Sequence, residues 1–272
     1  MIDAKPFARF HARRRIIENN SVSGLRTAYL TVMTLLALIT GMLVIIAVSI
    51  LTLGQAKNFL VSKFGGWMGR FVLFCAGVKI KFEYLQKPTP HPAIYIGNHS
   101  STLDIFLILA MQLPAVRFVA KHEFLYNPPF AIMGLLTGQI FIKRQDSERA
   151  IATLNRAYAR IRRQRLSLFL MPEGTRMEHG QIGPFKKGAF RMAMDLQYPI
   201  VPIYFGGARR LCPGKSLQVR RGTVLLRFNP AVDTRDWTSE NLDENVARVR
   251  ADYVRWHEEF NQNDEALVAP AK

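Results

Sequence analysis

Cysteine is scarce in this sequence, and no residue spacing suits a metal ion. The two cysteines, Cys75 and Cys212, lie in unrelated contexts among 272 residues. They predict neither a disulfide framework nor a zinc motif, which fits a reducing compartment. The six histidines also lack the spacing of metal ligands, so we expect chemistry that needs neither a metal nor a cofactor.

Acidic residues are also few, because 37 lysines and arginines face 20 aspartates and glutamates, a net charge of +17. Such a charge predicts an anionic partner: a membrane surface, a phosphorylated substrate, an acidic carrier or nucleic acid. The sequence carries no helix-turn-helix, zinc-finger or RNA-recognition signature, so we expect no nucleic acid. Basic runs at 147–165 and 209–221 would each suit a solvated face. Together they favour an anionic membrane lipid as partner.

Charge is missing altogether between Thr27 and Ala56, and residues 28–53 are apolar almost throughout. These 26 residues span about 39 Å as a helix, enough to cross a hydrocarbon core of about 30 Å with tilt. A buried core helix is a less favoured alternative. A cleaved signal peptide is also disfavoured, because its apolar region has about 7–15 residues. The basic leader, residues 1–26, predicts a cytoplasmic N-terminus.

The following segment, residues 58–78, is apolar with Lys63 and Arg70 on a polar edge. We interpret it as an interfacial or re-entrant helix that returns the chain to the starting side of the membrane. A core helix of the following domain is the plainer alternative. Residues 27–78 are then a membrane-embedded or interfacial hairpin, 79–262 a soluble domain with a C-terminal helix, and 263–272 a tail.

Apolar strands and helices alternate from Lys79 onward. The expected strands are 79–85, 93–98, 116–120, 139–143, 166–171, 200–205 and 224–229, and the expected helices are 103–111, 124–136, 147–163, 185–196 and 242–260. This alternation predicts an α/β fold with a mostly parallel sheet covered by helices, preceded by an N-terminal membrane-embedded helical segment.

A buried strand, a polar elbow and an apolar helix follow one another around His99. Neutral imidazole can take a proton from a hydroxyl near pH 7, and a carboxylate on its other nitrogen fixes the tautomer and stabilises the imidazolium. Residues five apart on a helix point about 140° apart, so Asp104 reaches His99 only if His99 precedes the helix. Ser100, Ser101 and Thr102 are good N-cap residues, which predicts a helix start among them. His99 and Asp104 are the candidate catalytic pair; a purely structural hydrogen-bonding histidine and cap is the alternative.

A second polar turn follows the strand that ends at Met171. Pro172 cannot continue a central strand, and Gly174 lets the backbone pass close to a ligand. Glu173 and Arg176 then share one turn and offer an acceptor and a cationic donor. A substrate with hydroxyls and a phosphate needs both, whereas a Glu–Arg pair that closes the turn is the structural alternative.

Two other strands carry weaker signals. The strand 139–143 delivers Arg144 at its carboxyl end, where ligands gather in α/β sheets, and its guanidinium suits phosphate. A plain surface arginine is the alternative. The run 198–203 has prolines at 199 and 202; it predicts either a slot for a hydrocarbon chain or an edge strand.

Together these blocks resemble the glycerolipid acyltransferases, most closely the 1-acylglycerol-3-phosphate acyltransferases, over residues 58–230. The matching motifs are N-H-x-x-x-x-D at 98–104, G-x-x-F-I-x-R at 138–144, P-E-G-T-R at 172–176 and V-P-I at 201–203. The resemblance implies that His99 is the general base, that Asp104 is its partner, and that Arg144, Glu173, Gly174, Thr175 and Arg176 bind the phosphorylated acceptor. It also implies that Lys121 matches a lysine found in many members, and that Pro202 lies near the acyl chain.

The resemblance further implies a membrane-bound enzyme of phospholipid synthesis at the cytoplasmic face of the inner membrane. It would move a fatty acyl group from an acyl carrier protein or coenzyme A thioester to the free hydroxyl of a lysophospholipid, 1-acylglycerol-3-phosphate. Direct transfer is favoured over a covalent serine at Ser100 or Ser101, because a neighbouring side chain is poorly placed for activation by the same imidazole. The alternatives are a related acyltransferase that acts on another lysolipid, and a non-catalytic anionic-lipid anchor.

Overall fold

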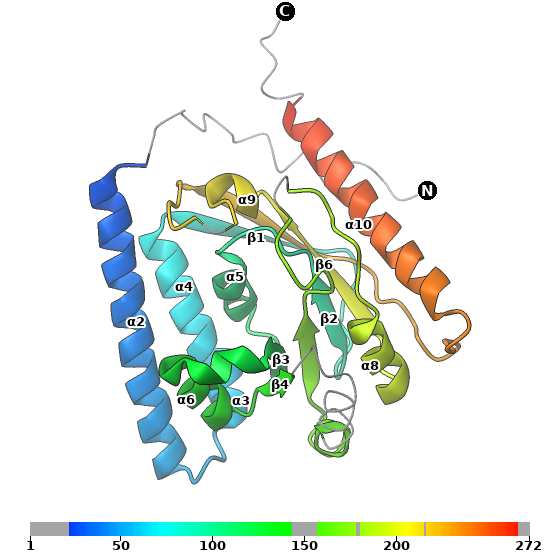
Figure 1. Ribbon diagram of the computed structural model, residues 1–272, viewed down its shortest axis with the longest axis horizontal. Coiled ribbons are helices and arrows are strands. Elements are labelled where there is room, and N and C mark those ends of the chain that lie inside the picture. The colour runs from blue at the N-terminus through cyan, green and yellow to red at the C-terminus, as the bar shows by residue number, and fades with distance from the viewer. Residues whose placement is uncertain (1–21, 143–156, 178–179, 215, 266–272) are drawn as a thin grey trace, which may run out of the picture.

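A seven-stranded sheet lies at the centre of the fold, between two layers of helices (Figure 1). The computed structural model describes residues 22–142, 157–177, 180–214 and 216–265. The strands are β1 (Val78–Tyr84), β2 (Ile94–Gly97), β3 (Val116–Lys121), β4 (Ile140–Ile142), β5 (Ser167–Leu170), β6 (Ile200–Gly206) and β7 (Gly222–Phe228). Their order across the sheet is β1-β7-β6-β2-β5-β3-β4, and each matches a predicted strand.

The helices match the prediction less closely. They are α2 (Gly24–Leu51), α3 (Lys57–Phe59), the π-helix η1 (Leu60–Phe64), α4 (Gly65–Cys75), α5 (Asp104–Ala110), the 3₁₀ helix η2 (His122–Tyr126), α6 (Pro128–Thr137), α8 (Gly188–Leu196), α9 (Ala208–Leu211) and α10 (Leu242–Glu265). The predicted helix 124–136 is split, because α6 begins afresh with its proline pair in the first turn, where proline is tolerated. Residues 157–163 are helical, and the rest of the helix predicted at 147–163 lies outside the described residues.

Strand direction confirms a mostly parallel sheet and adds one reversal. β2 is parallel to β5 and β6, β3 is parallel to β4 and β5, and β1 is parallel to β7. The pair β6–β7 is antiparallel. The two strands at one end of the sheet therefore run opposite to the other five. The carboxyl ends of β2, β5 and β6 meet at one edge, where parallel sheets usually bind ligands.

The prediction of an edge strand at 198–203 is wrong. β6 lies inside the sheet between β7 and β2, and all seven of its residues are buried. The carbonyl of Pro202 accepts a hydrogen bond from the backbone of Asn229, so its nitrogen faces the same neighbour. The ladder with β7 begins only at Ile203, and the N–H that Pro202 lacks is therefore not needed there.

Two hydrophobic clusters cover the two faces of the sheet. One joins α8, α10 and residues 157–163 to the sheet, and the other joins α4, α5 and α9 to its opposite face. α10 is fixed by Tyr253, whose buried hydroxyl donates to the carbonyl of Ile96 at 2.8 Å and accepts from the N–H of Ile203 at 3.0 Å. This contact ties the last helix to the middle of β6 and to the end of β2, next to the elbow that carries His99.

The helix α2 and the run from α3 to α4 form a hairpin (Figure 1). Gly41 lets α2 approach closely, because a Cβ there would lie 2.3 Å from the sulfur of Met68. At the open end, Arg26 donates to the carbonyls of Ala76 at 2.6 Å and Val219 at 3.2 Å. The chain thus returns to the level where α2 begins, and its return to the starting side of a membrane stays a prediction.

Most of α2 faces outward. It is long and apolar enough to cross a membrane by length and composition, and only Leu30, Gly41, Ile45 and Ser49 are buried. The alternative of a buried core helix is therefore wrong.

The helix α4 has two different faces. One packs on α5 as a core helix would, while Phe59, Trp67, Phe71 and Phe74 of the same helical run are exposed. The buried face fits the core-helix alternative for residues 58–78, and the interfacial or re-entrant interpretation stays a prediction. The predicted domain boundary between residues 78 and 79 separates α4 from α5, although α4 packs against α5.

Candidate active site

The elbow that follows β2 brings His99 and Asp104 together. His99 lies between strand and helix, and Asp104 is the first residue of α5. The Nδ1 atom of His99 lies 2.7 Å from Oδ2 of Asp104. The side chain of Asp104 is 1% exposed and that of His99 is 23% exposed. The structure thus confirms that this pair meets, with the carboxylate inside the protein and the imidazole at its surface.

The carboxylate of Asp104 also shapes the elbow. Its Oδ2 accepts the backbone N–H groups of Ser100 at 2.9 Å and Ser101 at 3.0 Å. The prediction that a serine or threonine N-cap starts the helix is wrong, because the N-cap is Leu103 and makes no side-chain cap bond. The Ser101 hydroxyl instead accepts from the Leu103 N–H and donates to the carbonyl of Cys212. The aspartate therefore organises the turn before its own helix.

These contacts define the tautomer of His99. An ionised Asp104 only accepts hydrogen bonds, so Nδ1 carries the hydrogen and Nε2 is the basic nitrogen. Among the described residues, no hydrogen bond to Nε2 competes for its lone pair. The geometry can therefore accept a proton at Nε2 and stabilise the resulting imidazolium through Asp104.

Glu173 holds the same histidine by its backbone. Its Oε1 accepts the N–H of His99 at 2.7 Å, and its Oε2 accepts the N–H of Gly183 at 2.9 Å. The side chain is buried, and burial raises the pKa of its carboxyl group, while the two backbone donors oppose that rise. Both oxygens of Glu173 thus accept hydrogen bonds from the backbone. They link the elbow at His99 to the loop at Gly183.

The rest of the turn after β5 lies beside the elbow. Gly174 has φ +68°, a conformation that glycine adopts without strain. Thr175 is exposed and Arg176 is half-buried. The guanidinium of Arg176 donates to the hydroxyl of Thr102 at 3.4 Å. A cationic donor thus lies over the first residues before α5.

The structure says less about the other predicted binding residues. Lys121 ends β3, and its side chain is not among the described ones. Arg144 lies outside the described residues, two positions after β4 ends at Ile142. Pro202 is buried inside the sheet as a partner of Ile96. The backbone therefore brings β3 and β4 to the same edge as the elbow, and the roles of these side chains stay predictions.

Asn98 is a functional candidate that the sequence analysis missed. Its side chain is 3% exposed and bonds both backbone groups of Phe205, accepting from the N–H at 2.8 Å and donating to the carbonyl at 3.2 Å. This pair of bonds fixes the elbow to the end of β6. The asparagine of the N-H-x-x-x-x-D motif was the available signal.

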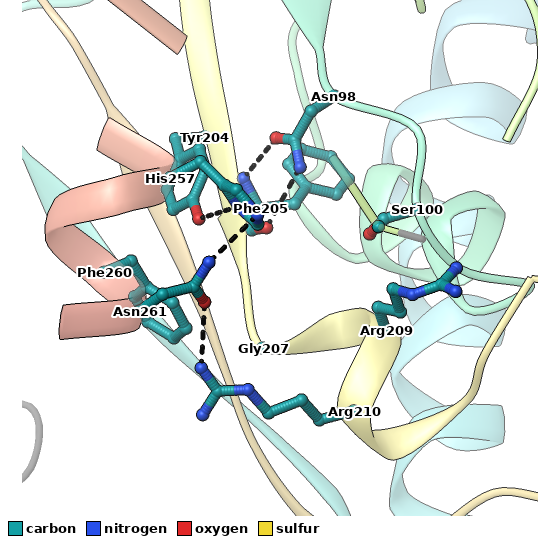
Figure 2. Close-up of a pocket in the computed structure, with 11 residues that line it drawn as sticks. Asn98, Ser100, Tyr204, Phe205, Gly207, Arg209, Arg210, His257, Phe260 and Asn261 are labelled. Atoms are coloured by element: carbon teal, nitrogen blue, oxygen red, sulfur yellow. Dashed lines mark hydrogen bonds between the residues drawn. The ribbon is translucent and has the colours of Figure 1, made fainter. Parts of the chain in front are cut away.

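A cavity of about 140 Å³ opens on the β6 side of the elbow (Figure 2). Asn98 and Ser100 form its wall next to His99, and Arg209 and Arg210 enter it from α9. The sequence analysis assigned these arginines to a lipid-facing surface. The structure places both in the wall of this cavity, and their contact with a lipid surface stays a prediction. Within the described part of the chain, no group of three or more potential metal ligands was found.

Known proteins are similar to this chain in sequence and in fold. The family model described as Acyltransferase matches residues 78–206. The 1-acyl-sn-glycerol-3-phosphate acyltransferase of Limnanthes douglasii is 32% identical over 71% of this chain and 68% of its own length. The enzyme of the same name from Haemophilus influenzae is 31% identical over 65% of this chain and 72% of its own length.

A human relative and a solved structure extend the comparison. The human 1-acyl-sn-glycerol-3-phosphate acyltransferase beta is 29% identical over 65% of this chain and 64% of its own length. The crystal structure of the 1-acyl-sn-glycerophosphate (LPA) acyltransferase PlsC from Thermotoga maritima has a TM-score of 0.70 and 22% identity. That match covers 91% of this chain and 97% of the other, which supports the fold along almost all of the chain.

Proposed function

Since this chain belongs to the family of 1-acyl-sn-glycerol-3-phosphate acyltransferases, we propose that it acylates the free hydroxyl of 1-acylglycerol-3-phosphate. The acyl group comes from a thioester donor, and the products are phosphatidic acid and a free thiol. The observation that carries this proposal is the 2.7 Å contact between Nδ1 of His99 and Oδ2 of Asp104. It leaves Nε2 of the half-buried imidazole for a substrate hydroxyl.

The reaction needs one proton to move twice. His99 Nε2 takes the hydroxyl proton while the hydroxyl oxygen attacks the thioester carbonyl and the carbon–oxygen bond forms. Asp104 stabilises the imidazolium that results. The carbon–sulfur bond then breaks, and the thiolate leaves with the proton from His99. Such a positioned base contributes about 10²- to 10⁴-fold to the rate.

The acceptor phosphate belongs, in this proposal, on the β5 side of the elbow. Arg176 supports it, because its guanidinium reaches Thr102 beside the catalytic turn. Lys121 ends β3 and Arg144 follows β4, the next strands along the sheet. Gly174 and Thr175 complete the turn that faces the acceptor. We assign Glu173 to positioning, since both of its oxygens accept backbone N–H groups.

The same proposal places the protein on a membrane. The outer faces of α2 and α4 expose large apolar side chains, among them Leu36, Leu43, Trp67 and Phe74. A single soluble chain seldom exposes a continuous apolar surface of this kind. We propose that the hairpin inserts from the cytoplasmic face of the inner membrane, where the lysophospholipid acceptor resides. Pro202, being buried in the sheet, would act on the acyl chain only through its neighbours.

An acceptor panel tests the activity. The full-length protein is supplied with a labelled thioester on acyl carrier protein or on coenzyme A, and with lysophospholipids that differ in headgroup. We expect acylation of 1-acylglycerol-3-phosphate with at least one donor. Transfer only to another lysolipid would show that this lysolipid, and not 1-acylglycerol-3-phosphate, is the acceptor. A complete absence of transfer would favour a non-catalytic lipid anchor.

Two variants locate the acceptor phosphate. Arg176→Ala and Arg144→Ala should each raise the KM for the acceptor about 10-fold or more, because each removes a charge-assisted contact to phosphate. The KM for the donor should stay within a factor of about two of the wild-type value. A change in the donor constant alone would contradict this placement of the phosphate.

A further inference from the structure

Three basic side chains meet at the amino edge of the sheet, opposite to the edge that carries the elbow. At Gly138, a Cβ would lie 3.5 Å from Nε of Arg117 and 3.9 Å from Nη1 of Arg160. It would lie 3.7 Å from Cδ of Lys57. These side chains come from β3, from residues 157–163 and from α3, and α3, α6 and β4 lie close together there (Figure 1). We call Lys57, Arg117 and Arg160 the basic cluster.

The basic cluster holds like charges close together. No ion pair between described residues includes Lys57, Arg117 or Arg160. Burial, and after it the charge of Arg160, lowers the pKa of Arg117 to about 10. The two guanidinium groups are therefore close enough to repel each other, and a neighbouring anion would relieve that repulsion.

The carboxyl end of α6 offsets only part of this charge. Gly138 is the C-cap of α6 with φ +74°, and its carbonyl accepts from Nη2 of Arg160 at 3.1 Å. Basic side chains favour such a position, because a helix end carries roughly half of a negative charge. The cluster carries three positive charges, so about two and a half of them still need an anion.

The basic cluster also has hydrogen-bond donors to spare. Arg117 is 2% exposed, and its terminal nitrogens donate to the carbonyl of Val116 at 2.8 Å and to Oδ1 of Asn58 at 2.7 Å. Nε of Arg160 is buried and has no acceptor among the described residues. A buried charged donor needs an acceptor. Phosphate oxygens suit guanidinium donors, because the planar fork matches their geometry.

The surroundings of Lys57 indicate where such a phosphate comes from. Lys57 is exposed and Arg160 is half-buried, so the basic cluster opens to the surface on the α3 side. On either side of Lys57 in the chain, Leu53 is 87% exposed and Phe59 is 46% exposed. Lysine beside exposed apolar side chains is typical of a boundary between membrane and water, where lipid phosphates lie.

We propose that the basic cluster binds one phosphate group of an anionic membrane lipid. The choice of a lipid over free phosphate rests on the proposed function, which places the hairpin on a membrane. The site is separate from the acceptor site, because Lys121 ends β3 and Arg144 follows β4 at the other edge of the sheet. The bound phosphate links Lys57 of the hairpin to Arg117 of β3 and stabilises the folded protein.

Melting temperatures of the full-length protein test the assignment. One arm uses phosphatidylcholine nanodiscs with or without phosphatidylglycerol. The other arm uses dodecyl maltoside micelles with inorganic phosphate, or with chloride at the same ionic strength. We expect phosphatidylglycerol to raise the melting temperature of the wild type by about 2–5 °C. Lys57→Gln and Arg160→Gln should each lose most of this rise.

Two matched controls remove the same charge from exposed positions nearby. They are Lys63→Gln on the hairpin and Arg163→Gln in the helical stretch that carries Arg160, and both should keep the rise. Melting in phosphatidylcholine alone shows that each variant folds.

Three results would overturn the site: no rise in the wild type, a rise that Lys57→Gln and Arg160→Gln retain, or an equal loss in all four variants. The last would indicate a general attraction between charges. An equal rise with inorganic phosphate, lost in Lys57→Gln and Arg160→Gln, would make free phosphate the ligand in place of a lipid. Because no acyl transfer is measured, these outcomes are independent of the acceptor panel.

Discussion

Two buried carboxylates hold different parts of His99. Asp104, at the start of α5, contacts the imidazole ring, whereas Glu173, after β5, contacts the backbone N–H. Both oxygens of Glu173 face neutral backbone donors, and burial raises the pKa of its carboxyl group. In the proposed mechanism a carboxylate therefore supports proton transfer at Asp104 and fixes geometry at Glu173, according to which atoms it faces.

Removing the ring contact should have the largest effect. Asp104→Ala leaves Nδ1 of His99 and the N–H groups of Ser100 and Ser101 without their shared acceptor. We expect kcat to fall about 10³- to 10⁴-fold, because the tautomer and the imidazolium both lose their support. Steady-state kinetics with a labelled donor measures the loss. Vesicle sedimentation should show unchanged membrane binding, and a variant with normal turnover would remove Asp104 from the mechanism.

Keeping the geometry but removing the charge should cost less. In Asp104→Asn, the amide oxygen can occupy the place of Oδ2, and its NH₂ group can occupy that of Oδ1, which has no partner among the described residues. The tautomer is then preserved, and only the stabilisation of the imidazolium is weakened. We expect kcat about 10²-fold below wild type, with little change in the melting temperature. A loss as large as that of Asp104→Ala would show that geometry is not preserved.

Changing the backbone contact should affect stability more than chemistry. Glu173→Gln places an NH₂ group against the N–H of either His99 or Gly183, so one buried donor is left unsatisfied. We expect a loss of about 1–3 kcal/mol in the free energy of unfolding. The expected fall in kcat is about 10-fold, from a small shift of the elbow.

The matched control is Glu244→Gln on the exposed first turn of α10, which should change neither quantity. A kcat loss for Glu173→Gln that exceeds the loss for Asp104→Asn would contradict the division of roles between the two carboxylates.

The smallest effect concerns pH. The pKa of Glu173 is raised in the folded protein, so the folded state holds its proton at a pH where the unfolded chain, with a pKa of about 4.3, has lost it. The stabilising contribution of this proton is present below the unfolded pKa and is lost as pH rises through the folded pKa. Melting temperatures from pH 4 upward should therefore fall in wild type relative to Glu173→Gln. A rise in the melting temperature of the wild type relative to that of Glu173→Gln would contradict a raised pKa for Glu173.

The elements that the sequence predicted best have strong local patterns. All seven strands were expected, and the meeting of His99 with Asp104 followed from their spacing around a helix start. The helix begins later than predicted, because Asp104 accepts the two serine N–H groups that the serine side chains were expected to organise. A buried carboxylate that already accepts those N–H groups outweighs the preference of serine for the N-cap position.

Other features depend on partners that are distant in the sequence. Glu173 bonds a residue 74 positions away, and Asn98 bonds one 107 positions away, so no local pattern indicates their roles. The edge strand expected from Pro199 and Pro202 is wrong because the β7 ladder starts just beyond the second proline. The arginines of α9 were recognised as a basic run, and only the tertiary fold brings Arg209 into the same cavity wall as Ser100.

A double-variant cycle on kcat tests the central claim most directly. In the proposed mechanism Asp104 acts on the reaction only through His99, so His99→Ala and the double variant His99→Ala/Asp104→Ala should have the same residual kcat. Both should lie about 10³-fold or more below wild type. Activity near the wild-type level in His99→Ala, or a further large loss on adding Asp104→Ala, would contradict a base at His99 that is oriented by Asp104.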